Sequence, residues 1–429
     1  MINPFATVLL ICTLALPVGN ARAQAATLTL PQCQARATQN YPMVKQRDLI
    51  AKSASYAVDQ HGTRSLPQIN INGQATYQSA VTEIPIHVPG MDIPTMNKDQ
   101  YKLYGEINQN LYDGGLTRLG KEAIEAEADV KHQALEVELY QIKARVNQLY
   151  FGILLLDAQL AQNDLLQKDI QAGLEKINAA IANGAALKSE GSLLEAEQLT
   201  TQQQATELQA SRQAYLHMLG LFIGRELDEH TSFERPVYPG SLSAITRPEL
   251  DWYSLQKNSL AVERRLLGAK TRPKLGLFLQ AGMGRPALNM LSSDFEAYYY
   301  GGIRLSISLS GFYTLKKERA QLDVKEAGID VQQETFVFNT NLTRHQQQTK
   351  AAKYKQLLLT DDAIIALRTS VKDAALAQLA NGVINTADYV RETHAVSSAR
   401  LSKIQHEIQL LKAQYDIRHT LGNIKNPQN

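Results

Sequence analysis

The longest pattern in this chain is a run of apolar residues at alternating steps of four and three positions. It extends from Leu135 to Ile181, with polar Asn163 and Gln167 in its middle, and includes Leu139, Ile142, Val146, Leu149, Ile153, Leu156, Leu160, Ile170, Leu174 and Ile177. A mean spacing of 3.5 residues predicts a coiled-coil helix whose seam faces a partner helix. Since no proline occurs from Leu116 to Asn183, the helix can be continuous and about 100 Å long.

A glycine turn at Asn183-Gly184-Ala185 is expected to end this helix, and a second helix is expected to return to about Phe222 as an antiparallel hairpin. A later segment repeats the same stepping at Leu401, Ile404, Ile408, Leu411 and Tyr415. Its outgoing arm, residues 336–379, is less regular, because Arg368 and Lys372 interrupt the apolar stripe. The sequence therefore predicts two long hairpins.

Four segments instead alternate apolar and polar residues with period two: 68–77, 101–111, 275–283 and 303–309. Their lengths are close to those of tilted transmembrane strands. Tyrosines at 77, 101, 104 and 298–300 are expected at the strand ends, in an interfacial belt. Four strands cannot close a barrel alone, so we expect three copies to supply twelve strands. A soluble sheet with one wet face is the alternative.

The two halves of the chain are related by an internal repeat. Pro42 and Pro67 are spaced like Pro248 and Pro273, and Ala182-Asn183-Gly184 recurs 198 residues later as Ala380-Asn381-Gly382. Such a period is far longer than a solenoid unit. We predict a signal peptide at 1–23, a first repeat at 24–224, a linker at 225–246, a second repeat at 247–422 and a tail at 423–429.

The N-terminal apolar stretch, residues 4–18, is too short for a transmembrane helix and ends in Ala21-Arg22-Ala23, as a secretory signal peptide does. Beyond it, Cys33 is the only cysteine, so no intramolecular disulfide is expected. The 44 basic and 42 acidic residues give a net charge of +2, which does not support nucleic-acid binding.

Catalytic, cofactor and metal sites are not predicted. Residues 115–121 match the glycine and lysine spacing of a phosphate-binding loop, but Glu122 stands where that loop needs Ser or Thr. The histidines and cysteines form no zinc-binding grouping, and no Gly-x-Ser-x-Gly motif occurs. An enzyme therefore has no support from the residues.

Together, the signal peptide, the duplicated half, two strands per half and the long hairpins resemble the TolC-like outer-membrane efflux protein family over almost the whole chain. The most specific local matches are the turn Leu111-Tyr112-Asp113-Gly114-Gly115 and the two tips, where Gly184 precedes Glu190 and Gly382 precedes Asp388 by six residues. The second turn keeps only Gly311 of that motif. The resemblance implies adaptor contact at the tips, through Gly184, Ala185, Ser189, Glu190, Gly382, Val383 and Asp388. Capping of the return helices is the alternative role for the two acids.

The resemblance implies an α+β membrane protein in which a long α-helical coiled-coil barrel continues a transmembrane β-barrel. It implies a homotrimer in the outer membrane of a Gram-negative bacterium, with outer-membrane lipid around the strands and helices projecting into the periplasm. Its partners would be a periplasmic adaptor and an inner-membrane pump, in tripartite efflux or type I secretion. The competing hypothesis is a periplasmic adaptor or another structural coiled-coil protein without a membrane barrel. The cargo stays open among drugs, metal ions and polypeptides.

Overall fold

The computed structural model describes residues 27–82, 85, 90, 96–238, 240 and 244–422 of the 429-residue chain. The signal peptide and the C-terminal tail expected from the sequence lie outside these residues, as does part of the linker. Within the described chain, seven α-helices and four strands are arranged in two successive groups. No helix of these segments combines the length and the hydropathy needed to cross a membrane.

The first group contains α1 (Leu30–Asn40), α2 (Gln46–Gly62), β1 (Gln68–Tyr77), β2 (Asp99–Tyr112), α3 (Leu116–Ala182) and α4 (Lys188–Ile223). Two 3-10 turns flank α2, at Pro42–Lys45 and Thr63–Ser65. The second group contains α5 (Pro248–Ala269), β3 (Lys274–Arg285), β4 (Glu296–Ser306), α6 (Gly311–Ala380) and α7 (Thr386–Leu421). In each group, one or two helices precede two strands, and a helical hairpin follows them.

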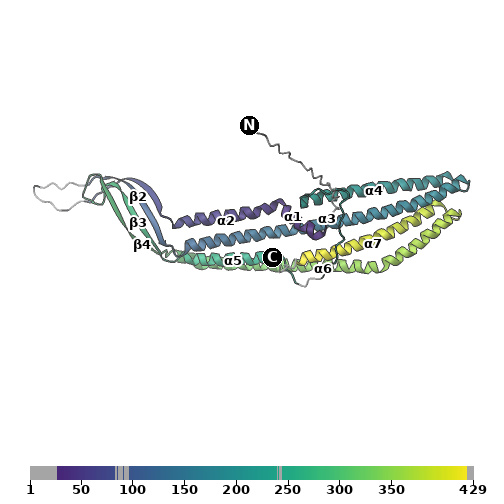
Figure 1. Cartoon of the computed structure of the whole chain (residues 1–429). Coiled ribbons are helices and arrows are strands. Elements are labelled where there is room, and N and C mark those ends of the chain that lie inside the picture. Colours follow the sequence, from purple (N-terminus) through teal and green to yellow (C-terminus); the bar gives the residue numbers. More distant parts are fainter. Residues whose placement is uncertain are drawn as a thin grey trace, which may run out of the picture.

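The molecule is elongated, with the sheet at one end and the tips of both hairpins at the other (Figure 1). The longest helices, α3 and α6, contain 67 and 70 residues. At 1.5 Å per residue each is about 100 Å long, which for α3 confirms the length expected from its proline-free sequence. The predicted end of the return helix near Phe222 also agrees with the end of α4 at Ile223.

Burial of the α3 seam explains why so long a helix is stable. One buried cluster joins the middle of α3 to α1, α4 and α7, and a second joins its distal part to α4, α6 and α7. Residues of the predicted stripe supply much of both clusters, including Leu139, Val146, Ile153, Ile170 and Ile177. Burying one such side chain stabilises by about 1.5–3 kcal/mol relative to leaving it exposed.

The four strands form one antiparallel sheet in the order β1-β2-β3-β4. Each strand continues into, or from, one helix: α2 leads into β1, β2 into α3, α5 into β3 and β4 into α6. The helices α2, α3, α5 and α6 follow the same lateral order, because α2 packs on α3, α3 on α5 and α5 on α6. Sheet and helices therefore form one layer, four elements wide.

The fourth strand differs from its predicted bounds. The sequence placed it at 303–309, but β4 runs from Glu296 to Ser306, and α6 already begins at Gly311. Tyr298, Tyr299 and Tyr300, expected at a strand end, lie inside β4. Pairing with β3 decides the bounds, since Gly284 is opposite Glu296 and Lys274 is opposite Ser306.

Candidate functional site

One face of the sheet is almost entirely apolar and exposed. Residues that pair directly across strands share a face, so Ile69, Ile107 and Leu279 lie together with Gly301. The neighbouring rows on this face contain Ile71, Leu103, Leu277, Met283, Ile303 and Leu305. Ile71 is 79% exposed, and the other large residues of this face are also exposed. A continuous apolar patch of this kind marks a protein or membrane contact.

The opposite face carries most of the amide and hydroxyl side chains of the four strands. It also carries an aromatic group that includes three tyrosines of the predicted interfacial belt. Tyr104, Tyr298 and Tyr300 lie on this polar face with Phe278, as the register requires. Tyr298 and Tyr300 stack with their centroids 6.3 Å apart, and the Arg304 guanidinium lies 4.7 Å from the Phe278 ring centroid. Of the six tyrosines expected in the belt, Tyr77, Tyr101 and Tyr299 belong to the apolar face. The expected belt is therefore wrong for half of its tyrosines.

Asp113 holds the turn that connects β2 to α3. Its Oδ1 accepts a hydrogen bond from the Gly115 amide at 2.8 Å, and its Oδ2 accepts from the Thr117 amide at 2.7 Å and from the Thr117 hydroxyl at 2.5 Å. Partial burial alone would raise the pKa of Asp113, but these hydrogen bonds to the carboxylate lower it below its ordinary value. Asp113 thus satisfies donors that begin helix α3.

Glycine is required at the centre of this turn. Gly114 and Gly115 both have positive φ angles, of 74° and 87°. A Cβ on Gly114 would lie 2.9 Å from the Cβ of Arg272, where the end of α5 approaches. At the second turn Gly311 is the first residue of α6, and it is not among the residues with positive φ. The two glycines are related by the repeat, yet only Gly114 has this conformational role.

The two tips have the same backbone geometry. At the first tip the Ala185 amide donates to the Ala180 carbonyl and the Gly184 amide to the Ile181 carbonyl, at 2.8 and 3.0 Å. The same pair of bonds recurs 198 residues later, from Val383 to Gln378 and from Gly382 to Leu379. This is the Schellman arrangement, which needs a left-handed residue at each glycine. Gly184 and Gly382 have φ angles of 73° and 66°.

The acids that follow the tips lie in the first turns of α4 and α7, and neither carboxylate accepts a capping hydrogen bond there. Asn385 caps α7 by accepting a hydrogen bond from the Asp388 amide at 2.9 Å, whereas the Asp388 carboxylate pairs with Arg391 at 2.9 Å. Helix α4 has no side-chain cap, and Glu190, in its first turn, makes no ion pair with the described residues. Ser189, Ala185 and Val383 are exposed nearby. The tips therefore present small exposed residues and two acidic groups.

Close to the tips, a polar cluster that was not predicted connects the two hairpins. Lys372 of α6 pairs with Asp169 of α3 at 2.7 Å, and these side chains are only 10% and 26% exposed. The Tyr389 hydroxyl donates to the Asp169 carbonyl at 2.6 Å, with its ring against Gly173. Arg368 pairs with Glu392 at 3.7 Å. The charges that interrupt the α6 stripe were the signal for this cluster.

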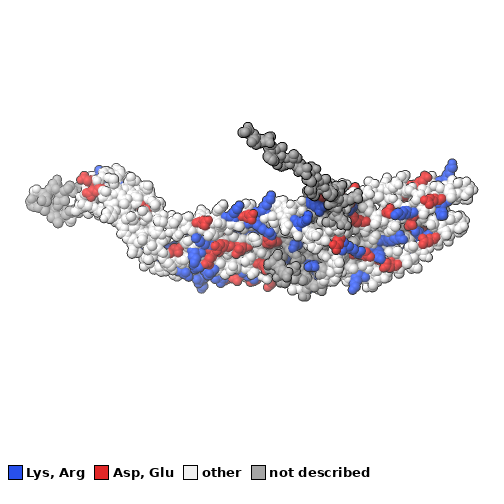
Figure 2. Space-filling view, viewed as in Figure 1, with Lys and Arg blue, Asp and Glu red and all other residues white. Residues whose placement is uncertain are grey.

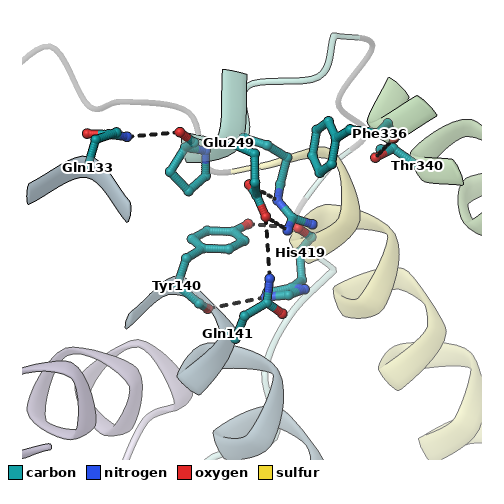
Figure 3. Close-up of polar contacts among 9 residues, drawn as sticks. Gln133, Tyr140, Gln141, Glu249, Phe336, Thr340 and His419 are labelled. Atoms are coloured by element: carbon teal, nitrogen blue, oxygen red, sulfur yellow. Dashed lines mark hydrogen bonds and ion pairs between the residues drawn. The ribbon is translucent and has the colours of Figure 1, made fainter. Parts of the chain in front are cut away.

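A second polar cluster lies where α5 begins and α7 ends, against the middle of α3 (Figure 3). Arg247 and Glu249 form a buried ion pair, with side chains 10% and 8% exposed. The Arg247 guanidinium lies 4.8 Å from the Tyr140 ring centroid, and the Tyr140 hydroxyl donates to the His419 carbonyl at 2.7 Å. The Tyr140 and His419 rings stack at 4.6 Å. This cluster fastens three helices from both halves of the chain.

Burial determines the protonation of this cluster. Burial, assisted by the nearby Arg247 charge, lowers the pKa of His419 to about 4, so its imidazole is neutral at neutral pH. Burial also raises the pKa of Tyr140 to about 12. The described residues contain no group of three or more His, Cys, Asp or Glu side chains that could hold a metal ion. The cluster is arranged for packing of helices, with its ionisable groups already paired.

Within the described residues, both lateral edges of the layer lack a partner. Strands β1 and β4 each have one unpaired backbone edge. Beside them, α2 exposes Leu49 and Tyr56, and α6 exposes Val324, Val331 and Phe338, in each case seven residues apart. Tyr56 is 70% exposed and Phe338 69%. A seven-residue apolar spacing is typical of a helix face that packs on another helix.

No family model and no curated protein sequence matches the chain. Its backbone is similar to those of several solved outer-membrane channels. VceC of Vibrio cholerae is 14% identical, with a TM-score of 0.63 over 92% of this chain and 96% of that one. CmeC of Campylobacter jejuni is 12% identical, with a TM-score of 0.63 over 92% and 85%. MtrE of Neisseria gonorrhoeae, crystallised in an open state, is 14% identical, with a TM-score of 0.63 over 91% and 88%. The chain thus has the fold of these channels, which confirms the fold expected from its resemblance to the TolC-like family.

Proposed function

We propose that this protein is an outer-membrane export duct, in which copies of the chain close a β-barrel through the membrane and a helical tunnel below it. The observation that carries the proposal is the placement of one apolar, exposed sheet face at the far end of helices about 100 Å long (Figure 1). The apolar face would contact lipid, and the face with Asn70, Asn72 and Gln74 would line water. A duct of this kind moves cargo without catalysis.

Closure follows from the two unpartnered edges. Strand β4 and helix α6 of one copy would pair with β1 and α2 of the next. Each contact would therefore join the β4 edge of one copy to the β1 edge of its neighbour. Repeated head-to-tail contacts of this kind generate a ring when the rotation closes. Closure also removes the unpaired strand edges, each group of which would cost several kcal/mol in hydrocarbon. Three copies would give twelve strands, enough to leave an aqueous lumen.

The direction of the helices decides which partners the duct meets. If the sheet lies in the outer membrane, the tips with Gly184 and Gly382 lie about 100 Å away in the periplasm. There they would meet a periplasmic adaptor and, through it, an inner-membrane pump that supplies the energy. The exposed backbone of both tips and the acidic residues Glu190 and Asp388 suit a contact of this kind. Tripartite efflux and type I secretion both need such a contact.

Cysteines at the tips test this orientation. Ala185→Cys and Val383→Cys are both exposed positions whose side chains support no packing. In whole cells, each should crosslink to the hairpin of an adaptor and should resist a membrane-impermeant thiol reagent added outside. A cysteine in place of Ser65, close to the sheet, provides a control that should not crosslink to the adaptor. Labelling of the tip cysteines in intact cells would contradict the orientation.

The competing function, a periplasmic adaptor, predicts a different oligomer and no membrane insertion. A periplasmic adaptor does not need a four-stranded sheet with an exposed apolar face, or sheet edges that require further strands. Purified protein should therefore run as a heat-resistant trimer in detergent, with a mass about three times that of one mature chain. A soluble protein that stays in solution without detergent would favour the adaptor instead.

A further inference from the structure

Five arginine side chains, from three helices and one connecting segment, line one pocket just beyond the sheet. Arg118 comes from α3, Arg264 and Arg265 from α5, Arg272 from the connection between α5 and β3, and Arg319 from α6. Leu119 and Gly268 complete the wall around a volume of about 280 Å³. This is several times the volume of a water molecule, about 30 Å³, so the pocket has room for an anionic group.

The positive charge of this pocket exceeds the negative charge that contacts it. Glu122 is shared between Arg118 and Arg265, and it lies 3.0 Å from the latter. Arg264 forms ion pairs with two carboxylates, Asp323 at 2.7 Å and Glu326 at 3.1 Å. The remaining two arginines contact no carboxylate within the described chain.

These two arginines have different surroundings. Arg272 donates a hydrogen bond of 3.2 Å to the Gly114 carbonyl, in the turn that Asp113 holds. The Arg319 guanidinium lies over Gly268, where an added Cβ would be 3.6 Å away. Because a guanidinium has five N–H donors in a fixed plane, one hydrogen bond leaves most donors of Arg272 available. The pocket therefore offers unused donors for an anion.

The pocket lies next to the strand ends. Beyond the sheet, the surface of the molecule changes from mostly uncharged to strongly charged (Figure 2). Arg272 is two residues before the start of β3, and Arg118 is six residues after the end of β2. At 1.5 Å per helical residue, these side chains lie within about 10 Å of the strand ends. A headgroup layer is about 5–8 Å thick on each side of the hydrocarbon core. If the sheet crosses a membrane, Arg118 and Arg272 of this pocket are at the level of lipid phosphates.

We propose that this pocket binds the phosphate of a phospholipid headgroup in the leaflet on the helical side of the membrane. Planar guanidinium groups match phosphate oxygens in pairs, which makes arginine better suited than lysine to this role. The lipid source of the phosphate rests on the proposed membrane barrel, whereas phosphate binding by the pocket does not. Through Arg272 and Gly114, the bound headgroup would fix the turn between strand and helix at a constant depth.

The test uses the full chain in detergent and three soluble probes. Dioctanoyl phosphatidylglycerol carries tails and phosphate, dioctanoylglycerol carries the tails alone, and glycerol phosphate carries the phosphate alone. Affinities are measured by native mass spectrometry for the wild type and for Arg272→Gln/Arg319→Gln. We expect the double variant to weaken phosphatidylglycerol binding at least about tenfold, as two lost charge-assisted hydrogen bonds would. Dioctanoylglycerol should bind weakly to both proteins.

A matched control removes two positive charges elsewhere, in Arg36→Gln/Lys350→Gln. Both side chains are exposed on helices, and Lys350 is about 60 Å along α6 from the sheet. The single variant Arg319→Gln removes no carboxylate contact, so its folding is not at risk, and it should weaken binding in the same direction. An unchanged affinity in the double variant, or an equal loss in the control, would overturn the proposal. Glycerol phosphate binding as tight as phosphatidylglycerol binding would overturn the lipid source.

Discussion

Replacing Leu279 with Arg is predicted to prevent stable assembly in a membrane, whereas the same residue at position 70 is predicted to be tolerated. Leu279 is the sixth of twelve residues in β3, and its side chain is exposed on the apolar face beside Ile107. Twelve residues extend about 40 Å, which a tilt of 45° reduces to a hydrophobic thickness of about 28 Å. In the proposed membrane barrel, position 279 is therefore close to the bilayer midplane.

The expected cost follows from that depth. An arginine on the lipid face at the midplane costs about 2–4 kcal/mol, or about 6–12 kcal/mol for a trimer if the three contributions add. Asn70 lies in the adjacent row on the polar face, directly opposite Glu106. Asn70→Arg would place opposite charges across the strands, worth about 0.2–1 kcal/mol in favour of the sheet. The two variants thus place arginine on opposite faces of the sheet at nearly the same depth in the membrane.

The assay is the fraction of heat-resistant trimer in lipid vesicles as a function of temperature, read by electrophoresis. Leu279→Ala serves as a further control, because it removes the leucine without adding a charge. We expect a large loss of trimer in Leu279→Arg, a small loss in Leu279→Ala and no loss in Asn70→Arg. Equal trimer yields for the two arginine variants would refute the assignment of the sheet faces.

Four further predictions concern the turn at Asp113, the contact between the hairpins, the tips and the polar cluster around His419. Asp113→Asn should lower the free energy of unfolding by about 1–2 kcal/mol, because it weakens three hydrogen bonds; Ser310→Ala, at a turn without a side-chain cap, should change it little. Lys372→Met should cost about 1–3 kcal/mol by leaving Asp169 partly buried without its cation, and Asp169→Asn in the same chain should restore part of it. Asp388→Asn and Glu190→Gln should alter the cation selectivity of single channels with nearly unchanged thermal midpoints; unchanged selectivity in both would remove the acids from the conduction path. The pKa of His419 is lowered to about 4 from its ordinary 6.5, so stability should fall by about 2–3 kcal/mol as pH drops from 6.5 to 4, and His419→Gln should flatten this dependence in thermal melts.

The longest part of α3 could be predicted from the sequence because one physical effect, burial of a heptad seam, determines it. The residues from Leu135 to Ile181 agree with the buried clusters of α3, and both glycine tips have the left-handed backbone that glycine permits. Three strands were also predicted nearly within their bounds, since alternation is a local signal. These features depend on neighbours that are close in sequence.

The features that sequence reasoning missed depend on contacts between distant segments. The start of β4 is fixed by its register with β3, and the same register places Tyr104 and Tyr300 on the polar face. Lys372 can be buried in the apolar stripe because its ammonium group pairs with Asp169 at 2.7 Å. Asp169 is more than 200 residues away in sequence, so no local pattern reveals this pair. Gly311 matched Gly114 by repeat position, but only Gly114 meets Arg272. No single-sequence pattern contains those pairings.

The most direct test of the central claim is the electrical conductance of planar lipid bilayers to which the purified full-length protein is added. A closed twelve-stranded barrel with a polar lumen predicts discrete, uniform current steps from a species that is trimeric in the same preparation. The steps should persist in Asn70→Arg and disappear in Leu279→Arg. A protein that forms trimers yet leaves the bilayer silent would contradict the export duct.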